Sequence, residues 1–340
     1  MDRQGPDGGN GQHSQQVFPG RKTRDRPGDV HRGVSPRYQD ALHRPDPPRG
    51  PAVQEVGIPE EVGSGKTAGR GGFVELPYVR IDSVSKVFET FSGDPILAIE
   101  GVSFDVRAGE FISILGPSGC GKSTLLRIVA GLLKPTGGSV SVGGATVQGP
   151  LKSIGFVFQR PVLFDWYRVL ANVLAPVELA GLKKKDYLDR ARELLHLVKL
   201  DGFEDKYPKE LSGGMHQRVA IARALILDPE ILIMDEPFGA LDALTRDQLN
   251  LELLKIWSAR RKTVLFVTHN IPEAVLLGDR VVVFSNRPGR VKAILPVDLP
   301  RPRTMEVKKH GKFGELEVEL YRLIAGAEDG ESKGPAPAAG

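Results

Sequence analysis

Residues 111–123 read FISILGPSGCGKS, in which an apolar run leads directly into the pattern G-x-x-x-x-G-K-S at residues 116–123. A helix-like stretch, Thr124 to Leu132, follows the pattern. The glycines let the backbone curl so that successive N–H groups point inward, and Lys122 adds a mobile ammonium group beside the positive end of the helix. The stretch therefore predicts a loop that cradles phosphate groups, with the Ser123 hydroxyl on Mg²⁺. A Gly-rich turn that only joins a strand to a helix is the weaker interpretation.

A second stretch, Gly63 to Thr67, repeats the end of this pattern inside a polar region rich in Pro and Gly. Glu60 occupies the place of the first glycine, and no apolar strand leads into the stretch. We expect no function for it, which leaves one complete phosphate loop in the chain.

The composition bounds the size of the folded part. The chain has 340 residues, but residues 1–76 are dense in Gly, Pro, Arg, Asp and Gln, with only scattered apolar residues. Ordering such a segment costs more conformational entropy than its burial returns, so we expect a disordered extension there and one domain of roughly 250 residues after it. The net charge of +4 is spread over interleaved acidic and basic residues, which argues against a nucleic-acid partner.

The cysteine count and the hydropathy pattern bear on the compartment. Cys120 is the only cysteine, so no disulfide forms within the chain, as expected in a reducing compartment. No stretch approaches the roughly 20 apolar residues of a membrane helix, and the first residues lack the apolar core of a signal peptide. We therefore expect the chain to remain in the cytosol.

Two kinds of strand pattern follow one another along the chain. Between residues 78 and 110, short alternating apolar segments predict small, partly exposed antiparallel strands. The continuous apolar runs at residues 111–115, 231–234 and 263–267 are typical of strands buried on both faces of a parallel sheet. Because helical patterns lie between these runs, the sequence indicates an α/β fold.

Two further segments carry a helical period. Residues 187–200 place apolar residues at three- and four-residue spacing, which predicts an amphipathic helix, and Lys183 to Lys185 before them are expected in a solvated loop. Near the C-terminus, a last helix candidate carries Leu316, Leu320 and Leu323 on one side.

The run at residues 231–234 ends in two carboxylates, Asp235 and Glu236. Asp235, at the end of a strand beside the phosphate loop, suits a contact with Mg²⁺, and Glu236 can accept a proton from an attacking water. An acidic turn without a catalytic role is the alternative. This alternative is the weaker one, because a metal ligand, a base and a phosphate cradle occur together in one chain.

A second glycine-rich helix start, LSGG at residues 211–214, precedes an uninterrupted helical stretch that ends at Leu225. Ser212 is a natural N-cap, and the two glycines let an anion approach the backbone amides. Together with the phosphate loop and the two carboxylates, this signature resembles an ABC-type ATP-binding cassette over residues 78–302. The resemblance implies a P-loop ABC ATPase cassette with a RecA-like core, a small antiparallel β-subdomain and a helical signature subdomain.

The resemblance also implies a division of the chain and a set of site residues. A cassette at residues 77–303 is followed by a C-terminal helix region at 304–326 and a disordered tail at 327–340. The family pattern assigns ATP binding to Phe88, Gly116, Pro117, Ser118, Gly119, Cys120, Gly121, Lys122, Ser123, Thr124 and Gln159. It assigns Mg²⁺ to Ser123, Gln159 and Asp235, and catalysis to Glu236, His269 and Lys122. It places Ser212, Gly213 and Gly214 against phosphates held by a second subunit, and Asp242 in the loop between subunits.

Several of these residues have a plainer alternative. In the family pattern Phe88 stacks on adenine, Gln159 senses Mg²⁺ and water, and His269 lies near the γ-phosphate. Phe88 could instead be an ordinary core residue, because aromatic rings stabilise cores as readily as they stack on bases. Gln159 and Asp242 could be surface turn residues, and His269 could be a structural histidine. For Cys120 we expect the helix terminus to favour the thiolate, with slow alkylation that ATP blocks.

Two local segments indicate which branch of the family the chain resembles. Residues 159–173 are similar to the segment by which importer cassettes engage a membrane permease, so Trp166 is either an exposed contact or part of the core. The turn Ser285 to Arg290 resembles that of nitrate, sulfonate and taurine importers. The resemblance implies a homodimer, peripheral at the cytoplasmic face of the cell membrane, that energises uptake of a small solute through permease subunits. A periplasmic or extracellular solute-binding protein is then an indirect partner.

Two other function classes remain open at this point. A soluble ABC-type ATPase that acts as an interaction factor tends to carry two cassettes or a long coiled coil between halves, and this chain shows neither. A nucleotide-binding scaffold without hydrolysis would lack a base, whereas Glu236 and His269 are both present.

Overall fold

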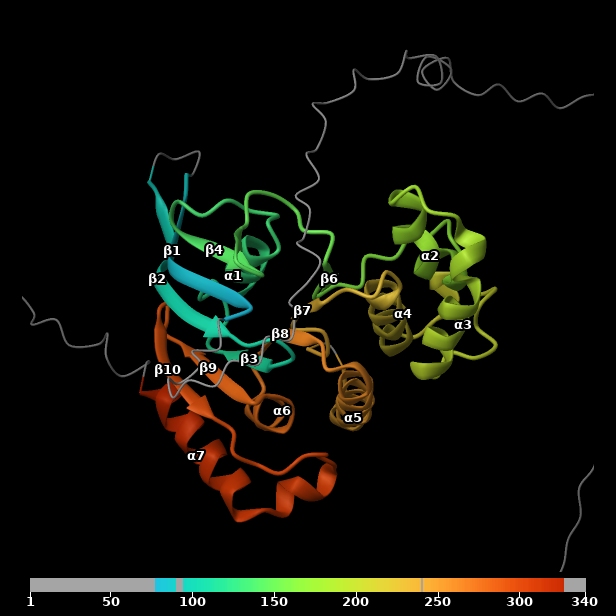
Figure 1. Ribbon diagram of the computed structural model, residues 1–340. Helices are drawn as coiled ribbons and strands as arrows, with labels where there is room; N and C mark the ends of the chain where they lie inside the picture. The colour runs from blue at the N-terminus through green and yellow to red at the C-terminus, as the bar shows by residue number, and fades with distance from the viewer. Residues whose placement is uncertain (1–76, 90–93, 240, 327–340) are drawn as a thin grey trace, which may run out of the picture. The chain divides into compact units, whose positions relative to one another are not determined.

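The computed structural model describes residues 77–89, 94–239 and 241–326. Within these ranges the chain forms two β-sheets with helices packed around them (Figure 1). The predicted extension at residues 1–76, with the incomplete loop at 63–67, and the predicted tail at 327–340 lie outside the described residues.

The larger sheet has six strands in the order β10, β9, β3, β8, β7, β6. Neighbouring strands run parallel, except that β10 is antiparallel to β9. The bounds are β3 (Phe111–Leu115), β6 (Ile154–Val157), β7 (Ile231–Asp235), β8 (Thr263–Thr268), β9 (Arg280–Phe284) and β10 (Val291–Pro296). The three continuous apolar runs are β3, β7 and β8, and every residue in them is buried. The prediction of strands buried on both faces is therefore confirmed.

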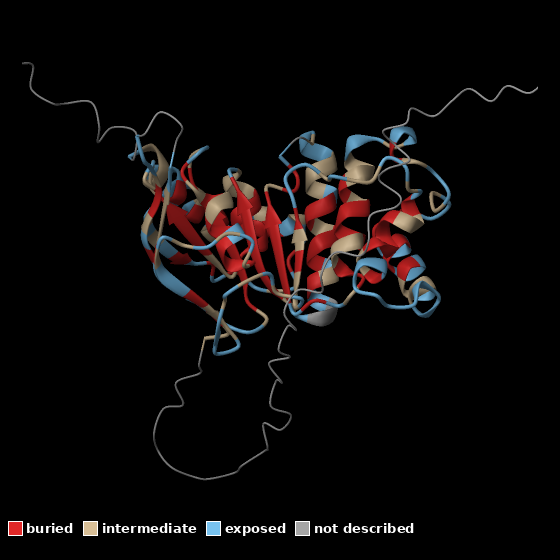
Figure 2. Cartoon of the chain, turned by 90° about the horizontal axis from the view of Figure 1, so that it is seen from above, coloured by how far each residue is buried: buried red, intermediate tan, exposed pale blue. Residues whose placement is uncertain are grey.

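Two hydrophobic cores, one on each face, explain why these strands are largely apolar, and the buried Ser113 hydroxyl of β3 donates to the Ala274 carbonyl oxygen at 3.0 Å. Successive side chains of a strand point to opposite faces of a sheet. Ile112 and Ile114 of β3 join one core, together with residues of helix α1 (Lys122–Val129) and of the smaller sheet. Phe111 and Leu115 join the other core, which the remaining helices complete. Figure 2 shows the buried strands between these layers.

The smaller sheet is antiparallel, with its strands in the order β2, β1, β4, β5. The bounds are β1 (Val79–Phe88), β2 (Ile96–Val106), β4 (Gly137–Val142) and β5 (Ala145–Thr146). In β2, Val102, Phe104 and Val106 are buried while Ser103 and Asp105 are exposed. This alternation confirms the predicted partly exposed antiparallel strands.

Helices α2 (Val169–Leu179), α3 (Leu188–Leu197) and α4 (Gly213–Leu225) pack on one another, and α4 also packs on β6. Figure 1 shows the three together beside the β6 edge of the larger sheet. The amphipathic helix predicted at residues 187–200 is α3, which buries Ala191 and Leu195. The solvated loop predicted before it is wrong in part, because a 3₁₀ helix begins at Lys184, whose ammonium lies 2.6 Å from Glu178 Oε2 of α2.

The remaining helices are α5 (Ala243–Arg260), α6 (Ile271–Leu277) and α7 (Gly311–Ala325). The predicted last helix is α7, which buries Leu316 and Leu320 and packs against α6 and β9. None of the helices in the described ranges combines the length and the apolarity that crossing a membrane requires.

Candidate nucleotide site

The phosphate loop connects the end of β3 to the start of α1, as predicted. Gly121, the residue before α1, has a φ of 101°, a left-handed conformation that side-chain-bearing residues rarely adopt. A Cβ atom on Gly121 would lie only 2.4 Å from Ile99 Cγ2 and 2.8 Å from the Ala98 carbonyl oxygen. Glycine is therefore required here both by backbone conformation and by the close approach of β2.

The ammonium group of Lys122 lies inside the loop. It donates hydrogen bonds to the carbonyl oxygens of Gly116 at 2.8 Å and Pro117 at 2.7 Å, and the residue is only 4% exposed. A buried charge is stable only when it is hydrogen-bonded, so the loop holds a preformed cation on its inner side.

Ser123 and Asp235 meet although 112 residues separate them in the chain. The Ser123 hydroxyl donates a 2.7 Å hydrogen bond to Asp235 Oδ1. Burial raises the pKa of the Asp235 carboxyl above its usual range, against the opposing effect of the Ser123 hydrogen bond. This serine and aspartate present two oxygen ligands side by side, which is the donor chemistry that Mg²⁺ prefers.

Glu236 follows Asp235 and receives two partners on one oxygen. His269 Nδ1 lies 3.1 Å from Glu236 Oε2, and Gln159 Nε2 donates to the same oxygen at 3.4 Å. Glu236 has a φ of 43°, in the left-handed region that is unusual for a residue with a side chain. Backbone strain of this kind concentrates at functional sites because the surrounding structure must hold it in place.

The strand register explains how residues from distant parts of the sequence converge. Leu115 of β3 pairs with Thr268 of β8, and Asp235 of β7 pairs with Val267. The phosphate loop, Glu236 and His269 therefore all follow the carboxyl ends of adjacent parallel strands, where α/β proteins bind their ligands.

A cleft of about 380 Å³ opens in front of the phosphate loop. Most of the predicted ATP-binding residues line it, together with two that sequence reasoning missed, Ala98 and Arg287. The predicted residues in its wall are Phe88, Ser118, Gly119, Gly121, Lys122, Ser123, Thr124, Gln159 and Glu236. Asp235 and His269 are not among the lining residues, but they are bonded to two of them, Ser123 and Glu236 respectively.

The signature residues and Asp242 do not line this cleft. The Ser212 hydroxyl caps α4 by accepting from the Met215 N–H at 3.4 Å, as the N-cap prediction required. Asp242 caps α5 in the same way, with Oδ1 accepting from the Thr245 N–H at 3.0 Å. Ser212 and Gly213 are exposed, so the start of α4 is open to a partner.

The expected thiolate character of Cys120 is wrong. Its side chain is 1% exposed, and burial raises the pKa of the thiol above its ordinary value in spite of nearby Lys122. Desolvation of a charge outweighs the helix terminus and the ammonium group here. Cys120 therefore serves the loop as a small packed residue.

Phe88 lies at the edge of the cleft with 37% of its surface exposed, so the alternative of an ordinary core residue is wrong. Its open ring is suited to stacking on a planar base. Lys86 Nζ stands 5.3 Å from the ring centroid.

This arrangement defines a class of protein. A glycine-rich loop with an internal lysine, a serine hydroxyl on an aspartate, and a glutamate held by a histidine form the site of a phosphate-loop nucleoside-triphosphate hydrolase.

Comparisons with known proteins identify the family within this class. Residues 99–239 match the family model of the ABC transporter. The chain is 52% identical over 225 residues to an uncharacterized ABC transporter ATP-binding protein of Methanocaldococcus jannaschii, covering 66% of this chain and 84% of that protein. It is 46% identical over 244 residues to the aliphatic sulfonates import ATP-binding protein SsuB of Bacillus cereus, covering 72% and 94%.

A solved structure gives the same result. An ATP-binding cassette in a dimeric post-hydrolysis state, bound to ADP and Pi, superposes with a TM-score of 0.58 at 34% identity and covers 64% of this chain and 98% of its own. The chain belongs to the ABC transporter family, as one of its ATP-binding, ATP-hydrolysing proteins. The predicted cassette fold and ATPase activity are thereby confirmed.

Proposed function

We propose that the chain is the motor subunit of an importer that takes up a small solute of the sulfonate class. The observation that carries the hydrolytic part is the placement of Glu236 in the wall of the cleft, held by His269 and Gln159 and next to the Ser123–Asp235 pair. The importer part is supported by the similarity to the sulfonate import protein. The alternative of an interaction factor without a transport role is not favoured by such relatives.

The residues of the cleft then have the following roles in ATP hydrolysis. The Lys122 ammonium and the loop N–H groups hold the outer phosphates, and Phe88 stacks on adenine. The Ser123 hydroxyl, the Asp235 carboxylate and the Gln159 carbonyl oxygen fit Mg²⁺, which neutralises phosphate charge when bound. Glu236 accepts the proton of the attacking water, while His269 orients the Glu236 carboxylate. Because phosphoryl transfer needs little covalent help, this positioning supplies most of the catalysis.

Two copies of the chain complete the site in this proposal. The exposed Ser212 and Gly213 at the start of α4 would face the phosphates held by the partner's loop, and the Asp242 loop would lie between the subunits. The dimeric state of the similar cassette supports this arrangement.

A complementation experiment tests the shared site. Lys122→Ala and Ser212→Ala each remove one half of every site in a homodimer, so each variant alone should be inactive. Mixing them at equal amounts gives heterodimers with one intact site, which restores about a quarter of the wild-type activity when subunits exchange freely. A mixture as inactive as its components would contradict the shared site.

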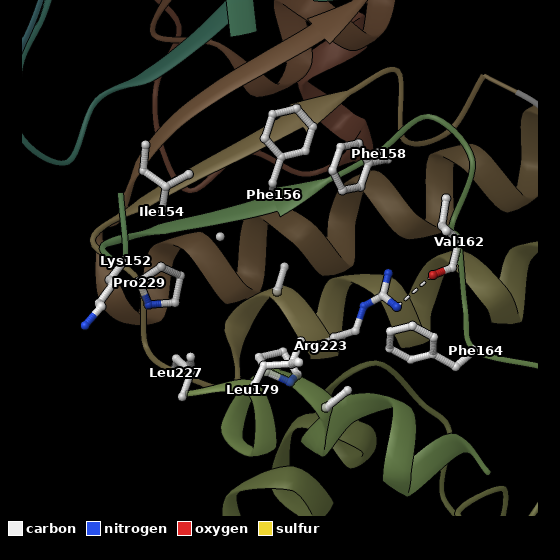
Figure 3. Close-up of a pocket in the computed structure, with 14 residues that line it drawn as sticks. Lys152, Ile154, Phe156, Phe158, Val162, Phe164, Leu179, Arg223, Leu227 and Pro229 are labelled. Atoms are coloured by element: carbon white, nitrogen blue, oxygen red, sulfur yellow. Dashed lines mark hydrogen bonds between the residues drawn. The ribbon is translucent and has the colours of Figure 1, made fainter. Parts of the chain in front are cut away.

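A second depression lies between β6 and helices α2 and α4. This apolar groove has a volume of about 350 Å³ and is lined in part by Phe156, Phe158, Val162 and Leu179. Figure 3 shows these side chains on its walls, with the Arg223 guanidinium bonded to the Val162 carbonyl oxygen at 2.8 Å.

The exposure of large apolar side chains around the groove supports a protein partner. Leu179 is 81% exposed, and Trp166 is 71% exposed, with its ring centroid 5.3 Å from that of groove-lining Phe164. The core alternative for Trp166 is therefore wrong. Exposed clusters of this kind mark interaction sites, so we assign the groove to the permease and place the chain at the cytoplasmic face of the membrane. An integral membrane protein that copurifies with the chain tests this assignment, and an exclusively soluble set of partners would overturn it.

The groove and the cleft share a boundary in the sequence. Strand β6 ends at Val157, Phe158 lines the groove, and the next residue, Gln159, lines the cleft.

A further inference from the structure

The turn Ser285–Arg290 brings a cation into the nucleotide cleft that the family signatures do not include. Arg287 lines the cleft together with Phe88, Ala98 and the phosphate loop. The turn follows β9, which lies beside β3 in the sheet, so the topology carries it to the same edge as the phosphate loop.

The turn is fixed from within. The N–H of Ser285 donates to the Arg290 carbonyl oxygen at 3.0 Å, and the N–H of Arg290 donates to the Ser285 hydroxyl at 3.0 Å. The same hydroxyl donates to the Pro288 carbonyl oxygen at 3.1 Å. The backbone that carries Arg287 is therefore preorganised, which lowers the entropy cost of using its side chain for binding.

The turn is also fixed to the loop and to β2. The Gly289 N–H donates to the Ala98 carbonyl oxygen at 3.0 Å, and the Glu100 N–H donates to the Gly289 carbonyl oxygen at 3.0 Å. A Cβ atom on Gly289 would lie 2.0 Å from the Cys120 carbonyl oxygen, so only glycine lets the turn approach the phosphate loop this closely.

The two arginines of the turn have different surroundings. Arg290 is paired with Glu100, its guanidinium lying 2.6 Å from Glu100 Oε2. No carboxylate pairs with Arg287 among residues 77–89, 94–239 and 241–326, and its side chain is exposed. Of the two cations in the cleft wall, Lys122 is bonded to carbonyl oxygens of its own loop, whereas Arg287 has its charge free for a ligand.

We infer that Arg287 is a nucleotide-binding residue that contacts the α- and β-phosphate part of ATP. Its turn is bonded to Ala98 and approaches Cys120, and Arg287 shares the cleft wall with the proposed adenine contact at Phe88 and with the end of the loop at Lys122 and Ser123. When a nucleotide contacts Phe88 with its adenine and Lys122 with its outer phosphates, its α- and β-phosphates lie between these two contacts. A guanidinium group suits them because its planar donors match phosphate oxygens.

Binding measurements on the full chain test this role, with ADP and a non-hydrolysable ATP analogue as probes. Arg287→Ala should weaken the affinity for both by a similar factor of about three to ten, since the contact involves phosphates that both share. Arg287→Lys should lose less affinity than Arg287→Ala, because it keeps the charge but lacks the planar pair of donors. The loss should shrink in about 0.5 M NaCl, where an exposed charge is screened.

Arg290→Ala is the matched control, because it removes a cation from the same turn but outside the cleft wall, and it should leave nucleotide affinity unchanged. Unchanged affinity in Arg287→Ala, or a loss of affinity confined to the ATP analogue, would overturn the inference. A lower melting temperature of the nucleotide-free Arg287→Ala protein, large enough to explain the lost nucleotide affinity by unfolding, would also overturn it. That result would show that Arg287 supports only the fold.

Discussion

The imidazole of His269 and the carboxylate of Glu236 lie 3.1 Å apart at the ends of two adjacent parallel strands. The glutamate is thereby oriented, and its second partner, Gln159, approaches the same oxygen. A carboxylate that two side chains hold by one oxygen in the wall of a cleft is positioned to receive a proton rather than to stabilise the fold.

Replacing Glu236 with Gln should slow ATP turnover by roughly a hundredfold or more, because an amide cannot accept the proton. Nucleotide binding should persist, so an ATP-bound dimer should accumulate, visible by size-exclusion chromatography. Glu306→Gln is the matched control, since Glu306 is exposed and paired with Lys309 on the surface. Full activity in Glu236→Gln would remove the residue from the mechanism.

Lys122→Ala should act on binding itself. The variant loses the only ammonium group inside the loop, and we expect nucleotide affinity to fall by at least about tenfold. Isothermal titration with ADP measures this directly, and Lys309→Ala, an exposed lysine, controls for loss of charge. Normal ADP affinity in Lys122→Ala would contradict the assigned role.

Trp166→Ala should reduce copurification with the permease severalfold while basal ATP hydrolysis by the chain alone stays the same. The ring is exposed beside the groove and lines no part of the nucleotide cleft, so its removal costs mainly contact area for a partner. Tyr321→Ala, another exposed aromatic residue, on α7, is the control. Equal copurification of both variants would place the permease elsewhere.

Cys120 should react slowly with iodoacetamide in the native protein, because the thiol is buried and its pKa is raised. Alkylation then depends on local opening of the loop, and ATP should slow it further by holding the loop closed. Mass spectrometry follows the modification over time. Rapid labelling that nucleotide leaves unchanged would show that the thiol is open to solvent.

Asp228 should make stability depend on pH in the acid range. Lys262 at 2.8 Å and Arg190 at 3.1 Å lower the pKa of its carboxyl from 3.8 to about 2. A lowered pKa in the folded state gives stability that is present above pH 3.8 and is lost as the pH falls toward 2. Asp228→Asn should therefore be less stable at pH 6 by about 0.5 to 1 kcal/mol, given the partial exposure, with the difference vanishing near pH 2.

Urea unfolding from pH 6 downward measures this difference. Asparagine tolerates the φ of 55° at this position, so the substitution tests the charge rather than the backbone. A difference in stability that stays constant with pH would contradict the ion-pair explanation.

Local chemistry made much of the site predictable from sequence. The loop at residues 116–123, the carboxylates after β7 and the caps at Ser212 and Asp242 each depend on residues adjacent in the chain. The three buried strands were predictable because a strand with a core on both faces consists mostly of apolar residues.

What sequence reasoning missed depends on packing between distant segments. Arg287 reaches the cleft because β9 lies beside β3, and no short-range pattern reveals that neighbour. Cys120 loses its thiolate character because surrounding side chains exclude water, which is a property of the folded state. Whether Trp166 is exposed likewise depends on how its loop packs against α2, so the sequence alone does not distinguish an exposed contact from a core residue.

One peptide bond joins Phe158, which lines the groove, to Gln159, which lines the nucleotide cleft. Phe158 is one of the residues that a partner in the groove would contact, and Gln159 donates a hydrogen bond to the Glu236 carboxylate. A partner that displaces Phe158 on docking would therefore also displace Gln159 and its hydrogen bond to Glu236. One glycine inserted between Phe158 and Gln159 should weaken this connection between the groove and the cleft.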